Sequence, residues 1–251
     1  MCAAGTCRTD RITYDDRITK PPEGLGVRLV SAGPLFFLVL ATVGCASVAS
    51  RTQLHPAVHV ETARAQVDIR ATVACRRGFL EQVCCGRGTR EHESLLVTDA
   101  PASVIQAALI AAGLRPGAPG AWHAAADGTV KRREPTGDPV EVRIHWMDGD
   151  VAAEVAVSEW LDDARPTRQP PSFVFAGSRF VSGPQGERFA ADLSGSVLGL
   201  VTFGDEVVAL REVEPDKVDV APARWRARSS VIPPEGTPVT LVLRRAGAPG
   251  I

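Results

Sequence analysis

Aromatic residues are scarce in this 251-residue chain, at 5% of the total, and lysine is scarcer still. The basic residues are 25 arginines and three lysines against 29 acidic residues, so the formal net charge is −1. A balanced charge argues against the basic surface of nucleic-acid-binding proteins, and few aromatic rings argue against stacking of single strands. Apolar residues make up 45% of the chain, which is typical of a globular protein.

The sequence also lacks the motifs of common enzyme classes. It has no G-x-S-x-G nucleophile elbow, no H-E-x-x-H metal motif and no phosphate-binding Walker loop. Asp192-Leu193-Ser194-Gly195 matches the nucleophile loop of trypsin-like proteases only in part, because Leu193 stands where that loop has Asp. No C-x₂-C pair and no close set of four cysteines is present, so we expect neither a zinc site nor an iron–sulfur cluster. We predict no metal and no cofactor.

An apolar run near the N-terminus indicates an export signal. Residues 29–43 are apolar with four interruptions, and at 15 residues the run is shorter than the roughly 20 that a membrane-spanning helix needs. Arg28 precedes the run and small residues follow it, which is the three-part layout of a secretory signal. We therefore expect residues 27–44 to be a signal peptide. Residues 1–26 would then be a dispensable or misassigned leader, with translation starting at Val27.

Gly44-Cys45 ends this apolar run and resembles the bacterial lipobox, although Thr42 replaces the Leu usual three positions before the cysteine. In signals of that kind the cysteine is acylated, cleavage makes it the first residue, and the lipid holds the protein on a membrane. A cut near Ser47-Val48-Ala49, which would release a soluble periplasmic or secreted protein, and an uncleaved anchor are the alternatives. We expect an exported protein, either a membrane-anchored lipoprotein lipidated on Cys45 or a periplasmic protein.

The exported part is rich in predicted strands. Apolar and polar residues alternate over residues 67–73 and 140–146, a pattern typical of half-buried strands, and His145 falls on a polar face. Asp148-Gly149 predicts a hairpin after the second of these strands. We expect a tether over residues 45–66, one domain over residues 67–245 and a disordered tail over residues 246–251.

One helix is predicted, over about residues 99–113. Asp99 can cap it, Pro101 fits its first turn, and Gly113 can end it in left-handed geometry. Strands and a single helix do not alternate regularly. We therefore predict a strand-rich α+β domain in which this helix packs on a mainly antiparallel sheet.

Three further cysteines, Cys75, Cys84 and Cys85, follow the predicted tether. An oxidising compartment permits a disulfide from Cys75 to Cys84 or to Cys85, but not to both, because adjacent residues on a strand point to opposite faces. A tight turn at Arg77-Gly78 would instead leave Cys84 on the order of 13 Å from the position opposite Cys75, beyond disulfide reach. The alternative is that the thiols are small buried hydrophobes.

The densest polar cluster is Arg90-Glu91-His92-Glu93-Ser94. In a functional interpretation the two carboxylates are metal ligands or general bases, and His92 carries a proton. In the other interpretation the carboxylates pair with nearby arginines in a turn. We assign no catalytic residue and keep Glu91, His92 and Glu93 as candidates.

Several segments together resemble one family. Residues 75–81, residues 88–96 (Gly-Thr-Arg-Glu-His-Glu-Ser-Leu-Leu), residues 173–178 and residues 232–244 resemble the YdjY-domain proteins of bacteria. The resemblance covers roughly residues 67–244. Family members often have Lys where Arg90 stands and a single Cys near the Cys84-Cys85 pair. The resemblance implies an exported protein and brings no established activity.

These observations predict an exported protein, anchored by the lipid on Cys45, that acts as a binding or structural module of the cell envelope. The alternatives are a metal-dependent hydrolase centred on Glu91, His92 and Glu93 and a thiol redox protein that uses Cys75 with Cys84 or Cys85. Neither the ligand nor a protein partner can be identified from the sequence.

Overall fold

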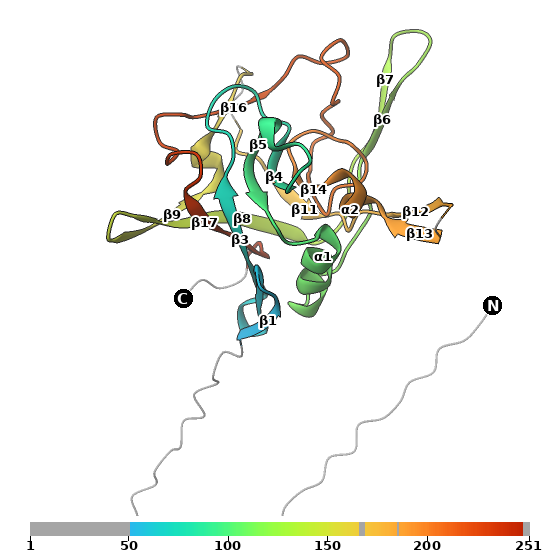
Figure 1. The fold of residues 1–251 in the computed structure, drawn as a ribbon. Coiled ribbons are helices and arrows are strands. Elements are labelled where there is room, and N and C mark those ends of the chain that lie inside the picture. Colours follow the sequence, from blue (N-terminus) through green and yellow to red (C-terminus); the bar gives the residue numbers. More distant parts are fainter. Residues whose placement is uncertain (1–50, 166–168, 185, 248–251) are drawn as a thin grey trace, which may run out of the picture. The chain divides into compact units, whose positions relative to one another are not determined.

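The computed structural model describes residues 51–165, 169–184 and 186–247, and its strands close into a barrel (Figure 1). Eight strands form the barrel, and the last of them pairs back with the first. In order around the barrel they are β3 (Gln66–Val73), β17 (Pro238–Arg245), β8 (Pro139–Asp148), β11 (Phe173–Phe175), β15 (Val208–Leu210), β14 (Ser196–Gly199), β4 (Gln82–Gly86) and β5 (Ser94–Thr98). The predicted leader, the signal peptide and Cys45 lie outside the described residues.

The closed barrel corrects the expected fold class. The prediction of an α+β domain with a helix packed on a mainly antiparallel sheet is wrong, because the sheet has closed on itself. Closure depends on β3, whose edge is shared: residues 66–69 pair with β2 (Val58–Glu61), and Thr72 and Val73 pair with Val97 and Leu96 of β5. Two of the barrel pairings, β4 with β5 and β14 with β15, are parallel.

Side chains fill the interior of the barrel. Along β3, Val67, Ile69, Ala71 and Val73 are buried, and the polar residues between them are more exposed, as the alternation predicts. Ile69 lies opposite Leu241 of β17, which in turn lies opposite Ile144 of β8. An eight-stranded barrel is just wide enough for side chains to fill it, and each large apolar residue buried this way contributes about 1.5–3 kcal/mol.

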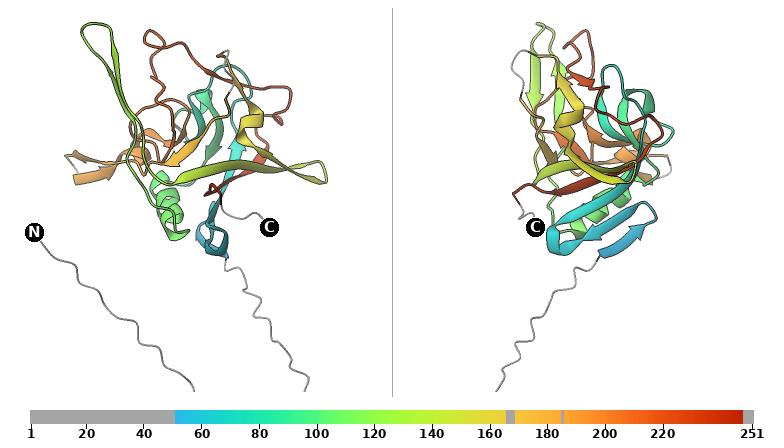
Figure 2. Two further views of the ribbon diagram at one scale, coloured as in Figure 1. Left: turned by 180° about the vertical axis from the view of Figure 1, so that it is seen from behind. Right: turned by 90° about the vertical axis from the view of Figure 1, so that its left-hand side faces the viewer.

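The predicted helix is present as α1 (Ala102–Ala111), which packs beside β2 and β3 (Figure 2). Its predicted cap differs: Pro101 precedes the helix without a side-chain cap, and Asp99 pairs with Arg87 instead. Asp192 of the short helix α2 (Ala190–Ser194) accepts a hydrogen bond from the Ser103 N–H at 2.9 Å, which satisfies one free donor of the first turn.

Part of the predicted tether is a hairpin. Residues 51–64 form β1 (Arg51–His55), β2 and the 3₁₀ turn η1 (Thr62–Arg64). Val58 and Val60 of β2 are buried and lie opposite Ile69 and Val67 of β3, so the segment extends the sheet. No helix among the described residues is long and apolar enough to cross a membrane.

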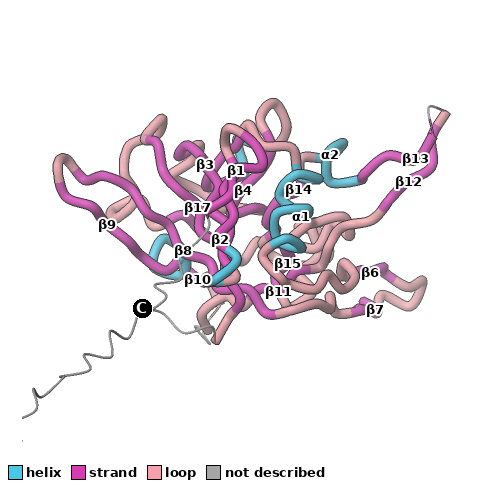
Figure 3. Tube along the Cα trace, turned by 90° about the horizontal axis from the view of Figure 1, so that it is seen from below, coloured by secondary structure: helices cyan, strands magenta, loops and turns pink. Residues whose placement is uncertain are grey.

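Three hairpins extend from the barrel (Figure 3). They are β6 (Ala121–Ala124) with β7 (Val130–Arg133), β8 with β9 (Val151–Ala156), and β12 (Phe180–Gly183) with β13 (Gly186–Phe189). The predicted Asp148-Gly149 turn joins β8 to β9, with Gly149 at φ +62°. A further pair, β10 (Leu161–Asp163) with β16 (Trp225–Ala227), follows the 3₁₀ turn η3 (Val157–Trp160).

Candidate functional site

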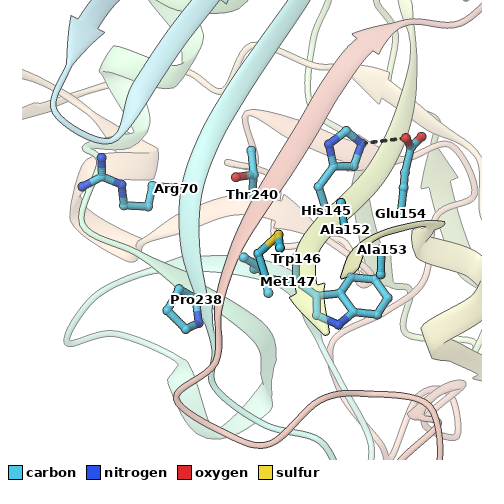
Figure 4. Close-up of a pocket in the computed structure, with 10 residues that line it drawn as sticks. Arg70, His145, Trp146, Met147, Ala152, Ala153, Glu154, Pro238 and Thr240 are labelled. Carbon is cyan, nitrogen blue, oxygen red and sulfur yellow. Dashed lines mark ion pairs between the residues drawn. The ribbon is translucent and has the colours of Figure 1, made fainter. Parts of the chain in front are cut away.

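A hollow of about 520 Å³ lies on the surface where β3, β17, β8 and β9 are neighbours (Figure 4). We call it the outer-face hollow. Its volume is in the range of small-molecule sites, which combine an apolar lining with a few polar groups. The apolar lining comes from Trp146, Met147, Ala152, Ala153, Pro238 and Val239, and the polar lining from Arg70, His145, Glu154 and Thr240.

The polar lining of the outer-face hollow is a single row across four strands. Arg70 of β3 lies opposite Thr240 of β17, Thr240 lies opposite His145 of β8, and His145 lies opposite Glu154 of β9. His145 is therefore on a polar strand face, as predicted. The other members of the row are brought to it by the register of the sheet.

At one end of this row, ion pairs compensate the negative charge of Glu154. Arg244 donates two hydrogen bonds to Glu141, at 2.8 and 2.9 Å, and Glu141 also pairs with Arg143 at 3.4 Å. Arg143 pairs with Glu154, and His145 Nε2 lies 3.2 Å from Glu154 Oε2. Burial raises the pKa of Glu154, but the hydrogen bond from Arg143 and the neighbouring charges outweigh it and hold that pKa below its usual value. Glu154 is thus an ionised and already compensated carboxylate.

At the other end of the row, the positive charge of Arg70 has no ion-pair partner among the described residues. Its side chain is exposed and makes no ion pair and no side-chain hydrogen bond with the rest of the described chain. Figure 4 shows Arg70 on the far side of the hollow from the His145–Glu154 pair. The outer-face hollow therefore offers a ligand an apolar surface and one available positive charge.

The predicted catalytic candidates do not converge. Glu91, His92 and Glu93 form the 3₁₀ turn η2 (Glu91–Glu93). Glu91 Oε1 accepts a hydrogen bond from the Gly88 N–H at 2.7 Å, and His92 is 74% exposed and lies 3.7 Å from Glu93. Among the described residues, no group of three or more His, Cys, Asp or Glu side chains comes together to hold a metal ion.

The three candidate cysteines are free thiols, so the possible disulfide is not formed. Cys84 and Cys85 lie on β4, which pairs with β5 and β14 rather than with the segment that holds Cys75. Both are buried, and burial raises the pKa of each thiol. A thiol with a raised pKa is a poor nucleophile, since the thiolate is the reactive form.

One candidate, Glu93, does meet a partner that the sequence did not single out. Glu93 hydrogen-bonds Glu81, and burial together with this bond raises the pKa of Glu81 to about 7. Arg90 lies 3.8 Å from Glu81 and stacks over the Phe203 ring at 3.7 Å. Glu81 lies 12 residues before Glu93, and no spacing pattern in the sequence relates the two.

Comparison with known families identifies the domain. A profile of the YdjY domain matches residues 58–244, from the start of β2 to Arg244 of β17. The chain belongs to the YdjY domain family. The resemblance seen in the sequence is thereby confirmed, and the matched range covers all eight barrel strands except Arg245, the last residue of β17. No curated protein matches the chain, and no solved structure does.

The carboxyl pair of this YdjY domain predicts a pH dependence of stability. Because the pKa of Glu81 is raised in the folded state, its contribution to stability is complete below about pH 4.5 and is lost as the pH rises through about 7. Buried Glu206, whose pKa burial also raises to about 7, has the same sign. We expect Glu81→Gln to be the more stable protein at pH 8, by about 1 kcal/mol given solvent screening, and to lose this advantage at pH 4.5.

Urea unfolding of both proteins across this pH range measures the effect. The matched control is Glu187→Gln, at an exposed carboxylate of the β12–β13 hairpin, for which we expect no such trend. An unchanged difference between Glu81→Gln and the wild type from pH 4.5 to 8 would contradict the raised pKa of Glu81.

Proposed function

We propose that this YdjY-domain protein is an exported, lipid-anchored binding module of the cell envelope, and that the outer-face hollow binds an amphipathic anion. The observation that carries the proposal is the composition of the hollow. It sets Met147, Ala152 and Pro238 beside Arg70, whose charge no other described residue neutralises. An acyl or other apolar group would cover the apolar lining, and a carboxylate or phosphate would pair with the guanidinium.

The position of Cys45 in the chain supports the anchored form of the proposal. Five residues lie between Cys45 and Arg51, where β1 begins, and the six Cα-to-Cα steps from Cys45 to Arg51 span at most about 21 Å. One acyl chain gives only marginal membrane binding, whereas several chains at about 0.8 kcal/mol per buried CH₂ hold a protein firmly. A lipid on Cys45 would therefore keep the barrel close to the membrane surface, where amphipathic anions are abundant.

Binding is favoured over catalysis because of where the polar groups lie. Glu91 is engaged in a local turn and His92 faces solvent, and Glu154, the carboxylate that lines the outer-face hollow, is held in an ion pair with Arg143. A catalytic site needs a reactive group and an orienting partner that converge on one point of a pocket. The outer-face hollow holds one such pair, His145 with Glu154, but Glu154 is also held by Arg143, and the pair lies on the far side of the hollow from Arg70.

Titration calorimetry with laurate, below its micelle concentration, tests the proposal. We expect laurate to bind, and Arg70→Gln to weaken binding about tenfold, which is about 1.4 kcal/mol. Met147→Asp should weaken it further, because it puts a negative charge on the apolar lining. The neutral analogue dodecanol should bind the wild type and Arg70→Gln equally.

Arg211→Gln is the matched control, since Arg211 is exposed and does not line the hollow. It should bind laurate as the wild type does. If laurate does not bind, or binds Arg70→Gln and Arg211→Gln alike, the outer-face hollow is not a site for amphipathic anions.

A further inference from the structure

The strand β9 has one edge without a strand partner among the described residues. β9 pairs only with β8, along the register from Asp148 opposite Val151 to Arg143 opposite Ala156. The Ala156 N–H donates a hydrogen bond to Glu159 Oε1 at 3.3 Å, and the other N–H and C=O groups that point away from β8 have no partner among the described residues. Such an edge is a template for pairing with a second chain unless the sequence protects it.

β9 lacks the usual protection. Its sequence, Val-Ala-Ala-Glu-Val-Ala, contains no Lys and no Pro, and its pairing with β8 runs without a bulge. Its single charge, Glu154, is neutralised by Arg143, and His145 Nε2 lies 3.2 Å from the same carboxylate. By contrast, β1 at the other end of the sheet carries Arg51 and a register shift, and β7 carries a Lys and two Arg.

Exposed apolar side chains accompany this edge. Met147 is 58% exposed and Val151 is 69% exposed, and both are near the tip of the hairpin, which extends away from the barrel (Figures 1 and 3). Exposed apolar residues beside an open, unprotected edge are typical of an interaction surface.

We propose that β9 pairs antiparallel with β9 of a second copy of this chain, around a two-fold axis perpendicular to the sheet. Rotation about such an axis leaves the same face of the sheet on the same side in both copies. Two residues can therefore lie opposite one another only when their side chains are on the same face of the sheet. Centring the axis on Glu154 would place two carboxylates directly opposite each other, which is destabilising.

Centring the axis on Ala153 removes that conflict. Ala153 then lies opposite the partner's Ala153, Val151 lies opposite the partner's Val155, and Ala152 lies opposite the partner's Glu154. In this register no two like charges lie opposite each other. The two-fold axis produces two apolar pairs, each between Val151 of one copy and Val155 of the other. The strand is therefore complementary to itself, which is why a second copy is the occupant that fits.

The expected dimer is weak, since pairing of two six-residue strands is small beside a standard interface of about 1,600 Å². The inference goes beyond the proposed function and does not depend on the ligand, although the pairing would bring two outer-face hollows to either side of the axis.

Cysteine cross-linking of the processed full-length protein tests the predicted register. Opposed residues of antiparallel strands have Cα atoms about 4.5–5.5 Å apart, which a disulfide can bridge. In a Cys75→Ala background, we expect Ala153→Cys to form a disulfide-linked dimer on mild oxidation, and peptide mapping should locate the bond between the two introduced cysteines. Ala152→Cys is the matched control, one residue away, and should cross-link at least tenfold more slowly.

Val151→Lys gives a second test that needs no introduced thiol, because Val151 is exposed in the free chain and its replacement should not disturb the fold. Sedimentation equilibrium should show a dimerisation Kd at least tenfold higher than that of the wild type, and laurate binding by the monomer should be unchanged. A wild type that stays monomeric up to millimolar concentration, equal cross-linking at residues 152 and 153, or no effect of Val151→Lys would overturn the proposal.

Discussion

Replacing Arg224 by Leu is expected to lower the free energy of unfolding by about 3–5 kcal/mol. Arg224 is buried and donates two hydrogen bonds to Asp163, at 3.1 and 2.9 Å, and one to Glu214 at 2.6 Å. The Asp163 side chain is only 3% exposed, so without Arg224 it would keep a buried charge with one distant cation, Arg165, at 3.7 Å. A buried charge that loses its partner is far more costly than an exposed one.

Urea unfolding measures this effect, and Arg165→Leu is the matched control. Arg165, like Arg224, contacts the carboxylates of Asp163, Glu212 and Glu214, but it is 42% exposed. Its loss should therefore cost no more than about 1 kcal/mol. Equal losses for the two variants would show that the buried position of Arg224 is not what matters. The double variant Arg224→Leu with Asp163→Leu should recover part of the loss, because it removes the uncompensated charge as well.

Gly137→Ala is expected to prevent the barrel from closing, with a loss above about 4 kcal/mol. Gly137 has φ +134°, and a Cβ built on it would lie 2.0 Å from the carbonyl oxygen of Phe175 in β11. That oxygen accepts the Gly117 N–H at 2.9 Å, and the Phe175 N–H donates to the Asp138 carbonyl at 2.9 Å. Backbone lies on both sides of the clash, so no flexible side chain can move to relieve it.

Circular dichroism and urea unfolding of Gly137→Ala measure the loss, with Gly128→Ala as the control. Gly128 also has a positive φ, +81°, but nothing lies within 4 Å of a Cβ built there. It should cost only about 1–2 kcal/mol, from the left-handed backbone alone. A Gly137→Ala protein as stable as Gly128→Ala would mean that the Gly137 segment is free to move away from β11.

The elements that the sequence predicted are those that depend on local pattern. The alternation over residues 67–73 and 140–146, the Asp148-Gly149 turn and the helix all appear at the expected places. Closure of the barrel was not predicted, because it depends on β5 meeting β3 through Thr72 and Val73, and side-chain period does not encode which strand edges meet. The β1–β2 hairpin was missed because it is short and its outer strand is exposed.

In the candidate site, too, the sequence predicted what depends on local pattern and missed what depends on strand pairing. Sequence placed His145 on a polar strand face, but Arg70 and Thr240 reach it from strands far away in the chain, through the register of β3 and β17. Likewise, Glu93 was singled out for its local cluster, whereas its partner Glu81 comes from the segment before β4. A site whose residues come from several strands can be predicted only when the pairing of those strands is known.

The claim on which the proposed function rests is export with a lipid anchor, and intact mass spectrometry of the protein from the membrane fraction of a bacterium that produces it tests this most directly. We predict a chain that begins at Cys45 and carries acyl chains, and loss of both the acyl mass and the membrane association in Cys45→Ala. An unprocessed chain in the cytosol, or a soluble chain that begins after Ala49 and carries no lipid, would contradict it.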